Sequence, residues 1–157
     1  MEFPPQLAAV AHDDPRLDRL LQLYVHEWTA LVPSPIGADA RYAYPDLPAW
    51  ADAVDHRAYL VMVDGRPHGF ALIARADGAW HVEEFFVVAG ARRGGLGRAA
   101  ALALFDAHPG PWTWSVRPEN PGASAFWRRV APTATAAPEP GDDGIVRTRL
   151  RLTWPPA

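Results

Sequence analysis

The chain has 157 residues, 15 of them basic and 18 acidic, and it contains no cysteine. With 49% hydrophobic and 21% charged residues, it is long enough and apolar enough for one globular domain with a hydrophobic core. The missing cysteines exclude disulfides, thiolate metal sites and thiol nucleophiles. All 15 basic residues are Arg, which also excludes a Schiff-base lysine and a Walker-type phosphate loop. A net charge of -3 gives no general attraction to nucleic acid or to an acidic membrane.

The first half of the chain predicts a strand, a helix and then three strands. Asp13, Asp14 and Pro15 give a helix-start signal. Apolar residues then recur at three- and four-residue spacing, so we expect an amphipathic helix that stops near Pro33. Residues 34–48 predict irregular structure. Tight turns with Asp-Gly pairs then separate strands. The remaining expected elements are a strand at 6–11, a short helix at 47–54, and strands at 59–63, 68–75 and 80–88.

The second half predicts a parallel crossover added to this antiparallel meander. A Gly-rich loop at 90–97 comes first, followed by a helix at 98–107, a strand at 112–116, a helix at 123–130, a loop at 133–144 and a final strand at 145–154. This order favours a mixed sheet in an α+β or α/β domain. No run approaches the roughly 20 apolar residues of a membrane helix, and the first 15 residues lack the features of a signal peptide. We therefore expect a cytoplasmic protein.

The Gly-rich loop lies between a strand and a helix. Unpaired backbone N–H groups at such a helix start, together with the helix dipole, favour an anion. Glycines let the backbone approach that anion closely, and Arg92, Arg93 and Arg98 add bidentate donors. The pattern indicates a pyrophosphate ligand. The alternative is a Gly-rich turn with solvated arginines.

Two known fingerprints overlap in this loop. Residues 95–100 fit the dinucleotide pattern G-x-G-x-x-A, but they follow three meander strands, and no acid ends the next strand. The run Arg92-Arg93-Gly94-Gly95-Leu96-Gly97 resembles the acyl-CoA motif of the GNAT superfamily of N-acetyltransferases. Residues 116–130 resemble the second block of that superfamily, V-R-x-x-N-x-x-A-x-x-(F/L)-Y. Both blocks come in family order, and the Phe-Trp pair at 126–127 resembles a bacterial branch of predicted acetyltransferases.

The resemblance implies an α+β fold with a mixed, largely antiparallel sheet of roughly six to seven strands flanked by about four helices. The sheet would be splayed between its fourth and fifth strands. The pantetheine of acetyl-CoA would lie in the splay, with its pyrophosphate on the loop amides. A β-bulge would expose the N–H of Val87 as an oxyanion donor. The implied cofactor-binding residues are Val87, Val88, Arg92, Arg93, Gly94, Gly95, Leu96, Gly97, Arg98, Asn120, Phe126 and Trp127.

Amine acetylation needs a base that takes a proton from the ammonium. Glu83 and Glu84 are the candidates, because carboxylates in an apolar strand are costly unless they are partnered or functional. Adjacent strand residues face opposite sides, so one of the two faces the cleft, and both stay open. Each could equally be an Arg-paired structural carboxylate. Ser115 stands where some relatives carry a catalytic Glu. Trp127 replaces the family's usual acid, a Tyr, and either contacts the sulfur or packs in the core.

The first helix and the segment after it predict the acceptor pocket. Aromatic and acidic groups suit a cationic amine, and this region offers Tyr24, Glu27, Trp28 and Tyr42, with His26 and Tyr44 beside them. We expect an acetyl-CoA-dependent N-acetyltransferase that acts on a primary amine of a small molecule or peptide. We expect neither nucleic acid nor membrane as partner, no metal, and a monomer or homodimer. The alternative is a CoA-binding pseudoenzyme or sensor. The net charge argues against a toxin that acetylates aminoacyl-tRNA.

Overall fold

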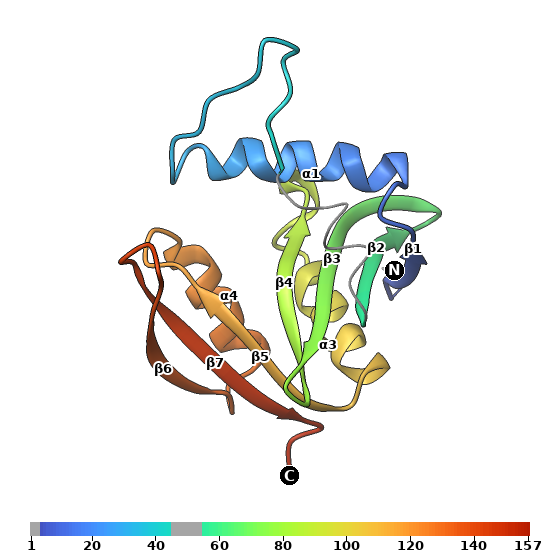
Figure 1. Ribbon diagram of the computed structural model, residues 1–157. Coiled ribbons are helices and arrows are strands. Elements are labelled where there is room, and N and C mark those ends of the chain that lie inside the picture. The colour runs from blue at the N-terminus through green and yellow to red at the C-terminus, as the bar shows by residue number, and fades with distance from the viewer. Residues whose placement is uncertain (1–3, 45–54) are drawn as a thin grey trace.

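The computed structural model describes residues 4–44 and 55–157 (Figure 1). Its helices are α1 (Pro15–Trp28), α3 (Leu96–Ala107) and α4 (Pro121–Val130), with a short 3-10 helix at Ala89–Ala91. Its strands are β1 (Gln6–Val10), β2 (His56–Val63), β3 (Arg66–Ala76), β4 (Ala79–Val87), β5 (Gly110–Val116), β6 (Thr135–Pro140) and β7 (Val146–Trp154). The helix expected at 47–54 lies outside the described residues.

The described strands form a seven-stranded mixed sheet in the order β1-β2-β3-β4-β5-β7-β6. Every neighbouring pair is antiparallel except β4 and β5, which are parallel. The chain crosses from β4 to β5 through α3, which confirms the predicted crossover. Among the described helices, none is long and apolar enough to cross a membrane.

The parallel pair, β4 with β5, has the fewest paired residues of the described sheet. β4 and β5 are paired only at Trp80 with Trp112 and at His81 with Thr113. By contrast, β5 pairs with β7 along its whole length, from Gly110 to Val116. Beyond His81 and Thr113 the two strands separate, so the predicted splay between the fourth and fifth strands is confirmed. Backbone groups of β4 along the opening are free of β5.

Helix α1 covers one face of the sheet. The helix starts where the sequence predicts, at Pro15 after Asp14. The side chain of Asp14 caps it by accepting a hydrogen bond from the N–H of Arg16 at 2.8 Å. It ends at Trp28, one turn before Pro33, and the following residues continue only as a turn. Its apolar stripe packs on side chains of β2, β3 and β4. We call this set the α1 cluster; its buried members are Leu17, Leu20, Leu21, Ala58, Leu60, Phe70, Leu72 and Phe86.

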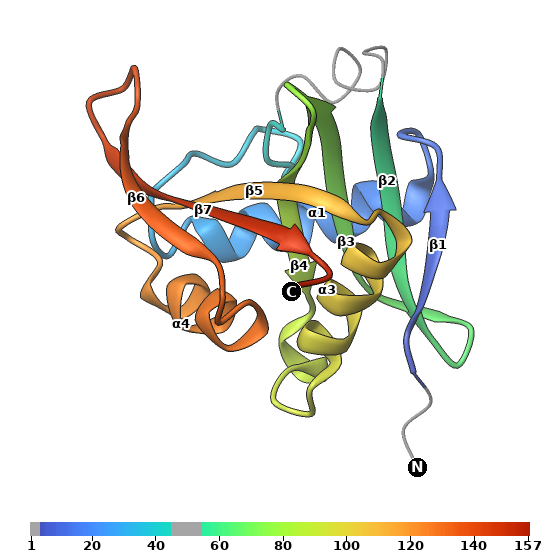
Figure 2. The same cartoon turned by 90° about the horizontal axis from the view of Figure 1, so that it is seen from below.

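Helices α3 and α4 cover the opposite face, so the sheet is the middle of three layers. In Figure 2, α3 lies in front of the strands and α1 behind them. Large aromatic rings fill the space beneath the two helices, and Phe105 of α3 stacks on Trp114 of β5 with ring centroids 5.8 Å apart. Trp127 of α4 lies 4.8 Å from Trp114. The opening between β4 and β5 therefore has α1 on one face of the sheet and α3 and α4 on the other.

The loop expected at 133–144 is wrong, because Thr135–Pro140 forms β6. β6 pairs with β7 from Thr135 opposite Arg151 to Pro140 opposite Val146. Its Ala- and Pro-rich composition has low strand propensity, so no local pattern predicts it. Pairing with the long β7 overrides that propensity, and an edge strand tolerates proline where the N–H would face away from its neighbour.

Candidate active site

A β-bulge sets the direction of the carboxylates on β4. Leu72 of β3 pairs with Glu84, and the next residue, Ile73, pairs with Val82. Glu83 is therefore the extra residue of the bulge. The bulge on this strand thus lies at Glu83, and the pairing of β4 with β3 is regular from Glu84 to Val87. After the bulge, the side chain of Glu84 lies on the α1 face of the sheet.

Glu84 is held by two tyrosine hydroxyls. Tyr24 of α1 donates a short hydrogen bond to its Oε2, and Tyr44, from the segment after α1, donates to its Oε1 at 3.2 Å. Burial raises the pKa of Glu84 to about 7, and the negative charge of Glu83 adds to the rise, while the two hydroxyls oppose it. Such a carboxyl changes its protonation state near neutral pH, as a general base must.

Glu83 has a different environment. Its side chain is 37% exposed, and its carboxylate lies 3.8 Å from Nε2 of His56. Glu84, in contrast, is enclosed against the α1 cluster beside Tyr24 and Tyr44. Of the two candidate bases, Glu84 is the one that the structure brings together with residues predicted for the acceptor pocket.

The predicted acceptor residues do not form a single group. Tyr24 meets Glu84, and the ring of Trp28 contacts Tyr24 edge-on at 6.2 Å. Tyr42 lies instead beside His26, with its hydroxyl 3.0 Å from Nδ1. Glu27 forms an ion pair that involves the Gly-rich loop. The acceptor pocket predicted from this region is therefore divided between the cleft and the outer side of α1.

The partner of Glu27 is Arg92. The Nη2 of Arg92 lies 2.6 Å from Oε2 of Glu27, and its Nε donates to the carbonyl of Val87 at 2.7 Å. Its guanidinium also lies 5.5 Å from the ring centre of Phe86. Arg92 thus connects the start of the loop to α1, and it is exposed, as Arg93 and Arg98 are. All three arginines of the loop therefore reach solvent, and Arg92 also pairs with Glu27.

The glycines of the loop have distinct structural reasons. Gly95 is the residue before α3, with a φ of 85° that disfavours a side chain, and no side chain among the described residues caps the helix there. The first N–H groups of α3 are therefore open to an anion. At Gly97 a Cβ would lie 3.1 Å from the ring of Phe126, so a glycine is needed for α3 to approach α4.

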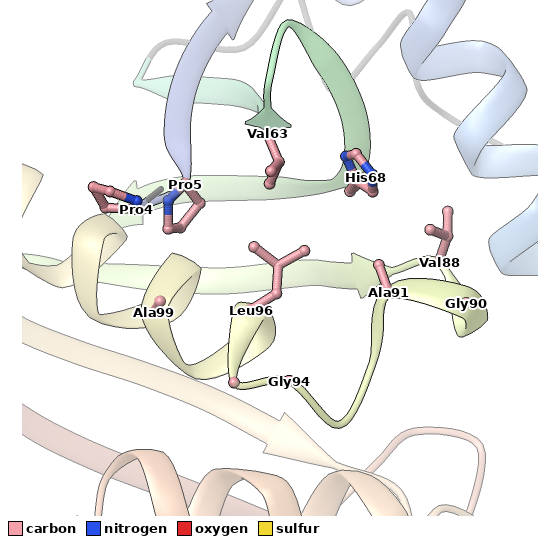
Figure 3. Close-up of a pocket in the computed structure, with 11 residues that line it drawn as sticks. Pro4, Pro5, Val63, His68, Val88, Gly90, Ala91, Gly94, Leu96 and Ala99 are labelled. Atoms are coloured by element: carbon pink, nitrogen blue, oxygen red, sulfur yellow. The ribbon is translucent and has the colours of Figure 1, made fainter. Parts of the chain in front are cut away.

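A hollow of about 520 Å³ borders the same loop (Figure 3). Figure 3 shows Val63 and His68, from the β2–β3 turn region, facing the loop residues across it. Four predicted cofactor-binding residues, Val88, Gly94, Gly95 and Leu96, contribute to its wall. The open amides of α3 therefore lie beside a space that a ligand could enter.

The backbone of β4 also presents donors to the splay. The N–H of Val88 donates to the carbonyl of His68 in β3 at 2.8 Å. Successive N–H groups along a strand point in opposite directions, so the N–H of Val87 points away from β3 and toward the side of β5. Because β5 has separated from β4 there, this N–H has the direction predicted for an oxyanion donor.

The second motif lies mostly in the packing of α4. The side chain of Asn120 caps this helix by accepting from the N–H of Ala123 at 3.0 Å. Trp127 is 6% exposed, and its ring lies 5.5 Å from Phe85 of β4. Phe126 stacks on Phe85 at 5.8 Å. The aromatic pair therefore forms the side of the splay that faces α4, and its contact with a cofactor stays a prediction.

Sequence reasoning missed one carboxylate near β5. Ser115 leaves no acid on β5 itself, yet its Oγ donates to Oε2 of Glu139 at 3.0 Å. Glu139 comes from β6 and forms a bidentate pair with Arg149 of β7. These partners lower its pKa, with the hydrogen bonds of Arg149 as the main cause. The sequence did not indicate this carboxylate, because the segment that contains Glu139 was expected to be a loop.

Comparisons with known proteins agree with this geometry. Residues 17–131 match the family model of the Acetyltransferase (GNAT) family, and the chain belongs to that family. It is accordingly an acyltransferase of the N-acetyltransferase class. No curated protein sequence is significantly similar to it.

Solved structures share the fold over nearly the whole chain. An acetyltransferase from Thermus thermophilus superposes with a TM-score of 0.73 at 21% identity, covering 98% of this chain and 99% of its own. The ribosomal-protein-S18-alanine N-acetyltransferase of Escherichia coli gives 0.65 at 14% identity, with 98% and 96% covered. An acetyltransferase from Bacillus anthracis strain Ames, solved with acetyl coenzyme A, gives 0.50 at 14% identity, with 68% of each chain covered.

Proposed function

We propose that the protein transfers the acetyl group of acetyl-CoA to a primary amine of a small molecule or peptide. Membership of the GNAT family supports the cosubstrate, as does the acetyl coenzyme A bound to the similar Bacillus anthracis enzyme. The similar Escherichia coli enzyme acts on an alanine of a ribosomal protein, which is an amine acceptor of the proposed kind. The open amides of α3 beside exposed Arg93 and Arg98 suit the pyrophosphate.

The observation that carries the proposal is the carboxyl of Glu84 on the α1 face, hydrogen-bonded by Tyr24 and Tyr44, whose pKa burial raises to about 7. In its ionised form it accepts a proton from the acceptor ammonium, and the neutral amine attacks the thioester carbonyl carbon. The N–H of Val87 then donates to the oxyanion of the tetrahedral intermediate. Collapse of that intermediate breaks the C–S bond and releases coenzyme A.

Trp127 has no proton to give at neutral pH, so the thiolate leaves without a side-chain acid at this position. The solution pKa of a thiol is only about 8.5, which makes such a departure feasible. The buried ring of Trp127, packed on Trp114 and Phe85, supports a role in shaping the α4 side of the splay.

The test measures thiol release from acetyl-CoA with a panel of primary amines between roughly pH 6 and 9, the range in which a base of this kind titrates. Glu84→Gln should lower kcat at least tenfold at neutral pH, with a smaller loss at high pH, where the amine deprotonates unaided. Glu83→Gln is the matched control, because its carboxylate is partly exposed on the neighbouring residue. Tight acetyl-CoA binding without turnover of any amine would instead support the pseudoenzyme or sensor reading.

A further inference from the structure

Each of the two carboxylate oxygens of Glu84 accepts a hydrogen bond from a tyrosine hydroxyl. Tyr24 donates to Oε2 and Tyr44 donates to Oε1, so one lone pair of each oxygen is taken by a hydroxyl. An ammonium can give its proton to the remaining lone pair of a Glu84 oxygen, or it can pass the proton through one of these hydroxyls. Which hydroxyl can meet an amine is decided by how each tyrosine is packed.

Tyr24 is enclosed by the core. Its ring meets Phe70 and Phe86 at 5.6 Å each and Trp28 at 6.2 Å, all in edge contacts. Burial is the main reason that its own pKa is raised. The hydroxyl of Tyr24 therefore contacts Glu84 from among the aromatic rings of the α1 cluster.

Tyr44 is likewise partly buried against the α1 cluster. It belongs to the segment after α1 and is less deeply buried than Tyr24. Gln22 of α1 fixes this segment at Tyr42, because its amide donates to the Tyr42 carbonyl at 2.9 Å and accepts from the Tyr42 N–H at 2.8 Å. These two hydrogen bonds fix the backbone two residues before Tyr44, and so they help to keep the Tyr44 hydroxyl beside Glu84.

We propose that Tyr44 is a catalytic residue that carries the proton from the acceptor amine to Glu84. This inference rests on the proposed function. As the phenol proton moves to Oε1 of Glu84, the phenol oxygen takes a proton from the ammonium, so Tyr44 ends neutral and the amine ends unprotonated. After attack on the thioester, the nitrogen loses a second proton, which ends on the departing thiolate as the free thiol. Glu84 finally returns its proton to solvent.

The electrostatic surroundings suit this route. In the part of the chain that the structure describes, the groups acting on Glu84 are Tyr24 from α1, Tyr44 from the following segment and Glu83 from β4. Burial and the charge of Glu84 raise the pKa of Tyr44 well above its usual value. Tyr44 therefore does not ionise on its own, and it transfers a proton only when it receives another.

The experiment compares Tyr44→Phe with Tyr24→Phe in full pH profiles of kcat, using the best amine of the panel. Each variant keeps its ring and removes one hydroxyl from Glu84, so each raises the pKa of Glu84 and moves the acidic limb to higher pH. Only Tyr44→Phe should also lower the plateau, at least tenfold further than Tyr24→Phe. Urea unfolding confirms that both variants are folded.

The outcomes separate the two proposals. Equal plateaus for Tyr44→Phe and Tyr24→Phe, with Glu84→Gln slow, would overturn the role of Tyr44 and leave the base in place. Unchanged rates in Glu84→Gln would overturn the proposed base itself, and with it this inference. A solvent-isotope proton inventory that is curved for wild type and linear for Tyr44→Phe would support the two-proton transfer, and linear inventories in both would contradict it.

Discussion

Replacing Glu84 with Gln should stabilise the fold at alkaline pH and not at acidic pH. A carboxyl whose pKa is 4.5 when exposed and about 7 when folded binds its proton more tightly in the native state. The stability that this protonation contributes is fully present below pH 4.5 and is lost as the pH rises through about 7. Gln keeps the shape of the protonated acid and cannot ionise, so it does not suffer that loss.

The size of the effect follows from the pKa. Each pKa unit corresponds to about 1.4 kcal/mol, so the rise from 4.5 to about 7 corresponds to about 3 kcal/mol between acidic and alkaline limits. Relative to Glu84→Gln, the wild-type free energy of unfolding should therefore fall by about 2–3 kcal/mol between roughly pH 5 and pH 8.5. A constant offset between the two proteins is irrelevant, because only the pH-dependent difference reports the titration.

The measurement is urea unfolding at half-unit pH steps, with slopes compared to exclude changes in the unfolded state. Glu83→Gln is the control: it keeps Glu84 but removes the charge that adds to its raised pKa, so its stability should still fall with rising pH, by less than in wild type. Parallel profiles for wild type and Glu84→Gln would refute the reasoning, since Glu84 would then titrate alike in folded and unfolded chains.

Three further substitutions test the neighbouring parts of the site. Gly97→Val should weaken acetyl-CoA binding in titration calorimetry, because its side chain would meet the ring of Phe126 at the start of α3; unchanged affinity would contradict this. Trp127→Phe should cost on the order of 1–2 kcal/mol of stability and at most about tenfold in kcat; a thousandfold loss in a folded variant would show that the indole acts chemically. Arg92→Ala and Glu27→Gln should each destabilise by about 1 kcal/mol or less in urea, and the double variant should cost less than their sum, since the pair is partly exposed; strict additivity would deny the ion pair.

Local pattern predicts much of this fold. The alternating apolar strands, their tight turns and the Gly-rich entry to α3 each have a signature within a few residues, and the structure confirms the mixed sheet and its splay. β6 has no such signature, because its strand state comes from pairing with β7. Propensity alone cannot report a contact with a segment that follows later in the chain.

The site was predicted less completely, for the same physical reason. The sequence identified Glu83 and Glu84 but not the choice between them, since that depends on the bulge that β3 imposes on β4. The charge of Arg92 was readable, but its direction was not, and it turns to Glu27 of α1. The contact of Tyr44 with Glu84 joins residues 40 positions apart, through a segment without regular structure.

The edge strand β6 also limits how copies of this protein can associate. Pro138 and Pro140 lie in register with Thr148 and Val146 of β7, and a proline nitrogen has no hydrogen to donate. Both nitrogens therefore face the open edge, where a neighbouring strand would need donors. A second copy that added a strand there would find neither of these two donors, which disfavours edge-to-edge aggregation along that margin.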